Sequence, residues 1–75
     1  MKKKVVCIMP QGRVDVAHVE ETTPFLTITM IMEMGGSSVL EVPIEEIEVE
    51  GKKFFYTRYS SEVPEEVVIE AVLTH

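Results

Sequence analysis

Cysteine is almost missing from these 75 residues, and tryptophan is missing altogether: Cys7 is the only cysteine. A lone thiol excludes an internal disulfide and fits a reducing compartment, where it would be buried as a small apolar group. The two histidines, His18 and His75, add too few ligands for a zinc site. A chain this short buries only about 60% of its unfolded surface. Because neither disulfides nor zinc can reinforce the core, we expect a homo-oligomer, with a dimer favoured.

Long apolar runs are also missing. The apolar run that follows the first three lysines extends only from Val5 to Met9, where Pro10 stops it. A secretory signal needs about 7–15 apolar residues, and a membrane span needs about 20. We therefore expect one cytoplasmic domain over residues 1–75, with no membrane contact.

Lysine and arginine are absent between Val14 and Gly51, a stretch rich in acidic residues, and the chain carries a net charge of −6. A surface of this kind repels nucleic acid and attracts basic protein surfaces. We expect a protein partner with a basic surface and no direct nucleic-acid binding. The residues expected to contact that partner are Glu41, Glu45, Glu46, Glu48 and Glu50. The alternative is an ordinary solvated acidic surface.

Turn-forming residues interrupt the chain at 9–13, 22–24, 35–38 and 51–52. This short spacing indicates β-hairpins. The predicted strands are 3–9, 13–20, 25–34, 39–42, 46–50 and 53–59. The sequence therefore predicts an α+β domain that is mainly β. We expect an antiparallel sheet of five or six strands built from hairpins, either open or partly closed as a small barrel, with one C-terminal helix.

Strand 25–34 shows the clearest alternation of apolar and polar residues. One of its faces carries Leu26, Ile28, Met30, Met32 and Met34. The three methionines suit either a core or an adaptable interface, and the sequence leaves this choice open. Since a one-residue slip would exchange the two faces, we expect an odd-length loop that pairs Met30 with Val42 and Met32 with Leu40.

The segment 64–73 fits a helix or a strand. Pro64 and the glutamates that follow it suit the first turn of a helix. The apolar face would then consist of Val68, Ile69, Val72 and Leu73. The β-branched residues of the segment also suit a strand. We expect the helix.

No set of residues in the sequence is placed for catalysis. His18 and Glu20 share a face of a predicted strand, but a metal site usually needs three or four ligands. Cys7 lies in an apolar strand, where a thiol is inert. The serines lie in predicted turns and lack a nucleophile-elbow motif. We therefore expect no enzyme activity and no catalytic, metal or cofactor site.

The segment 52–59 interleaves aromatic residues with cations. A turn at 51–52 would pair Val49 with Phe54, and if Phe54 faces the core, Lys53 and Phe55 lie on the opposite face. Exposed aromatics beside cations are typical of surfaces that stack bases or nucleotides. The residues expected to hold a small nucleotide-like ligand are Lys53, Phe55, Arg58 and Tyr59. The alternative is an aromatic core strand with solvated flanks.

The function that fits these features best is a non-catalytic protein–protein interaction module, acting as an acidic inhibitor or regulator that occupies a basic site on its target. Two alternatives stay open. The first is an oligomeric protein that binds a small nucleotide-like molecule. The second is a structural subunit of a larger assembly, because a marginal core and free sheet edges favour association.

Overall fold

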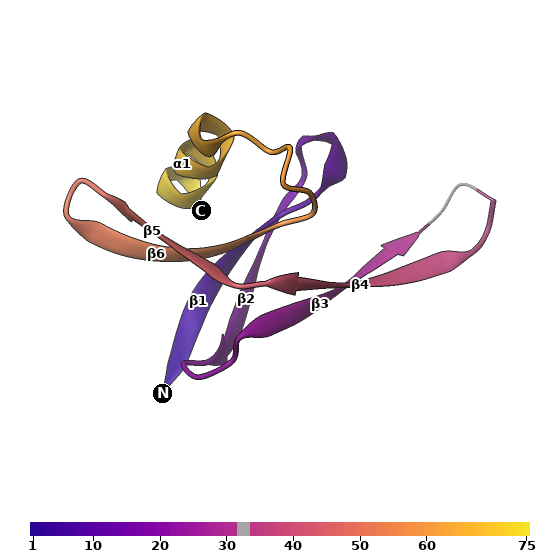
Figure 1. Ribbon diagram of the computed structural model, residues 1–75, viewed down its shortest axis with the longest axis horizontal. Helices are drawn as coiled ribbons and strands as arrows, with labels where there is room; N and C mark the ends of the chain where they lie inside the picture. Colours follow the sequence, from indigo (N-terminus) through magenta and orange to yellow (C-terminus); the bar gives the residue numbers. More distant parts are fainter. Residues whose placement is uncertain (32–33) are drawn as a thin grey trace.

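The computed structural model describes residues 1–31 and 34–75, and within them the chain forms six strands and one C-terminal helix (Figure 1). The expectation of a mainly β domain with a C-terminal helix is confirmed. The elements are β1 (Lys2–Ile8), a short 3₁₀ turn (Pro10–Gly12), β2 (Val14–Glu20), β3 (Phe25–Ile31), β4 (Ser37–Pro43), β5 (Glu45–Val49), β6 (Lys52–Arg58) and α1 (Glu65–Thr74).

The six strands form two sheets, not the single sheet that we expected. The larger sheet has the order β2-β1-β6-β5, and over residues 1–31 and 34–75 β3 pairs only with β4. The two central strands of the larger sheet, β1 and β6, are parallel, with Val5 opposite Phe55. The larger sheet is therefore mixed and not wholly antiparallel. A central position suits β1 because Val5 to Ile8 are buried on both faces. Neither sheet closes into a barrel over the described residues.

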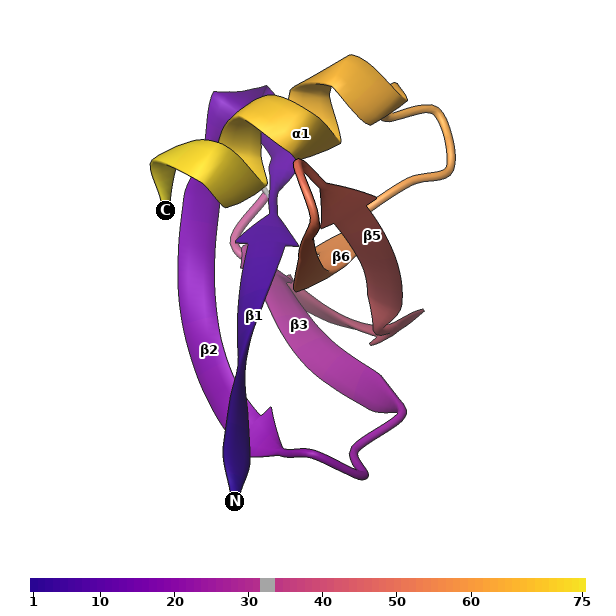
Figure 2. The ribbon, with the colours of Figure 1, turned by 90° about the vertical axis from the view of Figure 1, so that its left-hand side faces the viewer.

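Helix α1 lies across one face of the larger sheet (Figure 2). Side chains alternate between the faces of a strand, so Val6, Ile8 and Tyr56 point toward the helix and join its core. Val5 and Cys7 point to the other face, where they are also buried. The four-stranded sheet and α1 are called the body below.

The segment 64–73 is a helix, as expected, but its buried face differs from the expected one. Val68, Ala71 and Val72 are buried, whereas Leu73 is 53% exposed. The spacing of three and four residues places the buried side chains on one narrow stripe. Leu73 falls outside that stripe, and the small Ala71 allows the helix to approach the sheet. Glu65 and Glu66 occupy the first turn, where the helix dipole favours negative charge.

Both hairpin registers differ from the expected ones, although the faces expected for Leu26, Ile28 and Ile47 are correct. Ile28 lies opposite Leu40, and Leu26 lies opposite Val42. The expected pairing of Met30 with Val42 is therefore wrong, and Met32 lies outside the described residues. In the second hairpin Ile47, not Val49, lies opposite Phe54.

The strands β3 and β4 form an arm that extends from the body along the long axis of the molecule (Figure 1). The molecule measures 43 × 27 × 18 Å. At the base of the arm Ile28 and Val42 are buried. Farther out, Val39 is 67% exposed and Met34, in the turn, is 98% exposed. The arm thus carries apolar side chains into solvent.

In the described part of the chain, no helix has the length and apolarity that a membrane crossing requires.

Candidate functional site

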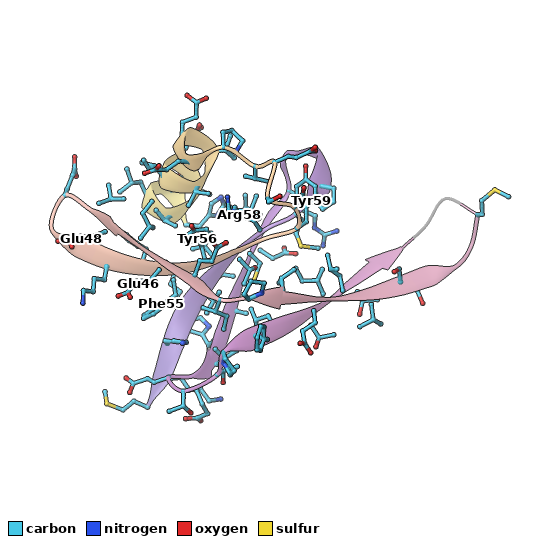
Figure 3. All side chains as sticks on the ribbon, viewed as in Figure 1. Glu46, Glu48, Phe55, Tyr56, Arg58 and Tyr59 are labelled. Atoms are coloured by element: carbon cyan, nitrogen blue, oxygen red, sulfur yellow. The ribbon has the colours of Figure 1, made fainter. Side chains whose placement is uncertain are left out.

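The four residues expected to bind a small ligand lie on two different faces of β6 and beyond its end. Phe55 points away from α1, whereas Arg58 points toward it (Figure 3). Lys53, two residues before Phe55 on β6, lies on the same face as Phe55 because side chains alternate along a strand. The Lys53 ammonium lies 3.7 Å from the Glu46 carboxylate. The Lys3 ammonium lies 4.6 Å from the centre of the Phe55 ring, a favourable cation–π distance. These two side chains therefore already have partners within the chain.

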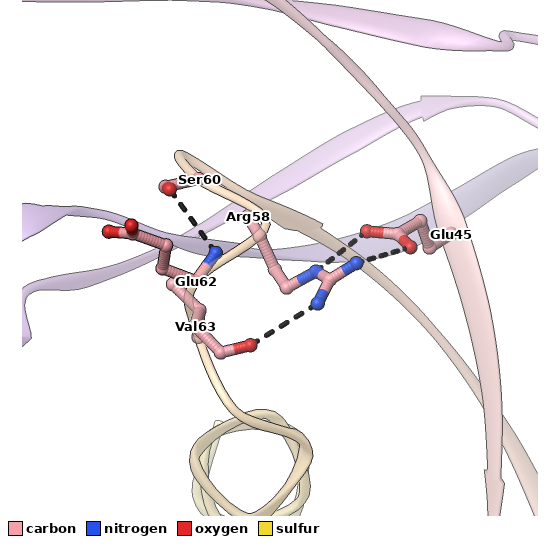
Figure 4. A network of polar contacts seen from close by, with 5 residues as sticks. All are labelled: Glu45, Arg58, Ser60, Glu62 and Val63. Atoms are coloured by element: carbon pink, nitrogen blue, oxygen red, sulfur yellow. Dashed lines mark hydrogen bonds and ion pairs between the residues drawn. The ribbon is translucent and has the colours of Figure 1, made fainter.

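Arg58 is engaged by three hydrogen bonds (Figure 4). Its Nε and Nη2 donate to the two carboxylate oxygens of Glu45, at 2.9 and 2.8 Å, and its Nη1 donates to the carbonyl oxygen of Val63 at 3.2 Å. The hydrogen bonds to Glu45 raise the pKa of Arg58 above its usual value. Tyr59 follows the end of β6 and is partly exposed. The four residues are thus not gathered into one site.

The five glutamates expected to contact a basic partner are also divided. Glu46 and Glu48 share the outer face of β5, and Glu50 lies in the turn that follows. Glu45 points to the helix side and Glu41 lies on β4 of the arm. The two lysines of the same hairpin, Lys52 and Lys53, lie across from Val49 and Glu48. They offset part of the negative charge at this edge.

A groove runs between α1 and the connection from β1 to β2. Two adjoining cavities of about 290 and 430 Å³ form it, and they share Ile8, Gly12 and Val67. Its aliphatic lining consists of Ile8, Met9, Val14, Val63, Pro64, Val67 and Ala71. We call this surface the α1 groove, and its lining also includes acidic side chains.

Glu62 and Glu70 border the α1 groove, one at the loop before the helix and one on the helix itself. No lysine or arginine of the described chain lines either cavity. Tyr59 also lines it, so one residue of the expected ligand set reaches this site. The combination of an apolar floor and an acidic rim suits a cationic ligand with an apolar part.

The α1 groove could not be predicted from the sequence, because its walls come from distant parts of the chain. Gly12 belongs to the first turn, Glu62 to the loop after β6 and Glu70 to α1. The helix start with its acidic residues was visible in the sequence. No local pattern indicated that it would lie beside the first turn.

Two further kinds of chemistry that side chains can provide are metal binding and thiol reactivity. Within the described residues, no group of three His, Cys, Asp or Glu side chains is close enough to hold a metal ion. Cys7 is buried, and this burial raises the pKa of its thiol, as expected for a thiol in an apolar strand.

No protein-family model, no curated protein and no solved structure matches this chain.

Proposed function

We propose that this protein is a non-catalytic protein–protein interaction module that binds a basic segment of its target in the α1 groove, as an inhibitor or regulator of that target. The observation that carries the proposal is the position of Glu62 and Glu70 on the border of an apolar groove that no described lysine or arginine lines. A cytoplasmic location belongs to the same proposal and is supported by the lone buried thiol.

The two parts of the groove select different parts of a ligand. Its apolar floor stabilises a buried aliphatic or aromatic side chain by about 25 cal/mol for each Å² removed from water. Its acidic rim pairs with lysine or arginine on either side of that anchor. The net charge of −6 adds a long-range attraction that accelerates association with a basic surface. The expected occupant is therefore a segment with an apolar anchor between cationic residues.

A synthetic peptide with leucines flanked by arginines tests this assignment. In an NMR titration of the full chain, we expect the amide signals of Val67, Glu70 and Gly12 to shift most. The double variant Glu62→Gln/Glu70→Gln should bind the peptide about tenfold more weakly, because two rim charges are lost. Added salt should weaken binding to the unaltered chain.

The matched control is Glu48→Gln/Glu50→Gln, which changes the net charge equally at the far edge of the sheet. We expect its affinity for the peptide to stay close to that of the unaltered chain. Equal losses in the two double variants would show that only the total charge matters and would remove the α1 groove from the proposal.

The small-ligand alternative has less support. Lys53 and Arg58 are paired with Glu46 and Glu45, and Phe55 lies beneath Lys3. A phosphate at Arg58 would have to compete with the two hydrogen bonds to Glu45. A role as a structural subunit has the free edges of the arm in its favour.

A further inference from the structure

One edge strand of this protein lacks the charged residues and proline that commonly protect a sheet edge against pairing with another chain. The borders of the two sheets are β2, β5, β3 and β4. Charged residues or proline interrupt three of them: Asp15 and Glu20 on β2, Glu46 and Glu48 on β5, and Glu41 and Pro43 on β4. In contrast, Phe25–Ile31 contains no charged residue, proline or glycine. Over the described residues, β3 pairs with β4 alone, so its second edge has free backbone groups.

The sequence of β3 is nearly a palindrome. It reads Phe-Leu-Thr-Ile-Thr-Met-Ile, centred on Ile28. In an antiparallel pair of two such strands about a two-fold axis at Ile28, Thr27 of one copy lies opposite Thr29 of the other. At all the remaining positions, an apolar residue lies opposite an apolar residue. Threonine pairs and apolar pairs are both favourable cross-strand neighbours.

We infer that the free edge of β3 binds β3 of a second copy of this chain, giving a homodimer with a continuous four-stranded sheet in the order β4-β3-β3-β4. The sheet ends there because the outer edges are then those of β4. Glu41 and Pro43 on that strand oppose further pairing, since proline cannot donate a ladder hydrogen bond. The assembly closes at two copies.

Electrostatics favours this contact over others between identical copies. Each chain carries a net charge of −6, so most surfaces of two copies repel each other. The uncharged β3 edge allows approach with little local repulsion. Added salt screens the remaining repulsion and should strengthen the dimer. Salt therefore acts on it in the direction opposite to its effect on a basic partner in the α1 groove, which separates the two proposals.

The side chains of Thr27 and Thr29 are exposed on one face of β3, so they can be changed without altering the buried base of the arm. We expect light scattering after size exclusion to give twice the 8.5 kDa chain mass for the unaltered protein. The variants Thr27→Lys/Thr29→Lys and Thr27→Glu/Thr29→Glu should each give the single-chain mass, because like charges meet across the two-fold axis. An equimolar mixture of the two should restore the dimer mass, since every lysine then faces a glutamate.

Ser37→Lys/Val39→Lys is the matched control. It adds the same charge to the same face of the arm on β4, where Ser37 and Val39 lie opposite Ile31 and Thr29, and it should stay dimeric. Circular dichroism checks that the charged variants remain folded. A single-chain mass for the unaltered protein at high concentration would overturn the inference. So would a dimer that survives both β3 variants, or a mixture that fails to recombine although both variants are folded.

Discussion

Arg58 on β6 and Glu45 on β5 meet through two parallel hydrogen bonds of 2.8 and 2.9 Å. The same guanidinium donates to the carbonyl of Val63 in the loop that leads to α1. Both side chains are mostly buried: 25% of the Arg58 side chain and 32% of the Glu45 side chain are exposed. The pair therefore ties the edge strand of the sheet to the loop that positions the helix and the α1 groove.

Replacing Arg58 by lysine should destabilise the fold, although the charge is kept. A lysine cannot supply the planar fork that binds both carboxylate oxygens and the Val63 carbonyl together. We expect the free energy of unfolding to fall by about 1–2 kcal/mol, measured by urea denaturation. Lys53→Gln removes the exposed pair with Glu46 and should cost less than about 0.5 kcal/mol. Equal losses would show that the three hydrogen bonds of Arg58 add nothing to stability.

Cys7 should make stability fall at alkaline pH, because burial raises its pKa in the folded chain. Below the usual thiol pKa of about 8.5, the folded and unfolded chains both keep the proton. Above it the unfolded chain loses the proton while the folded chain retains it, so unfolding becomes more favourable. We expect the free energy of unfolding to drop between about pH 8 and 10 more in the unaltered chain than in Cys7→Ala.

The comparison with Cys7→Ala isolates the thiol, because burial also raises the pKa of Tyr56 and that residue is present in both proteins. A thiol reagent at pH 8 should react slowly with the folded chain and quickly after unfolding. Parallel stability curves for the two proteins would contradict the assignment of the alkaline loss to Cys7.

Glu50 should be replaceable by asparagine with a gain in stability. It has a φ of 52° and is followed by Gly51 with a φ of 82°, the combination that a type I′ turn requires. Asparagine tolerates this left-handed region better than glutamate does. We expect Glu50→Asn to raise the free energy of unfolding by roughly 0.5–1 kcal/mol. Gly51→Ala should lower it, whereas Gly36→Ala, at a position without positive φ, should not. Loss of stability in Glu50→Asn would show that the glutamate side chain has a role beyond the turn.

This turn also explains why the hairpin register could not be predicted. Gly51 marks a turn in the sequence, but glutamate is not a typical turn residue, so nothing indicated that Glu50 would be its first central position. Strand positions within a few residues were predictable from alternation. A shift of two residues in register preserves that alternation, which is why the faces were assigned correctly and the partners were not.

Burial along a strand was better predicted than the choice of strand neighbours. The apolar run that begins at Val5 indicated a buried strand, and Val5 to Ile8 are buried. The parallel pairing of β1 with β6, the separate β3–β4 sheet and the α1 groove all depend on contacts between distant segments. Local patterns carry no information about those contacts, and the expected roles of the acidic and aromatic residues stay predictions.

The parallel pair at the centre of the larger sheet has a consequence for how fast the domain assembles. Val5 pairs with Phe55, so a loop that spans two-thirds of the 75-residue chain must close before the two middle strands can meet. Contacts between such distant residues slow folding, because the entropy of closing the loop is lost before the contact forms. The arm needs only a local hairpin turn. Hydrogen exchange during refolding should therefore protect β3 and β4 before β1, even though β1 is the more deeply buried strand.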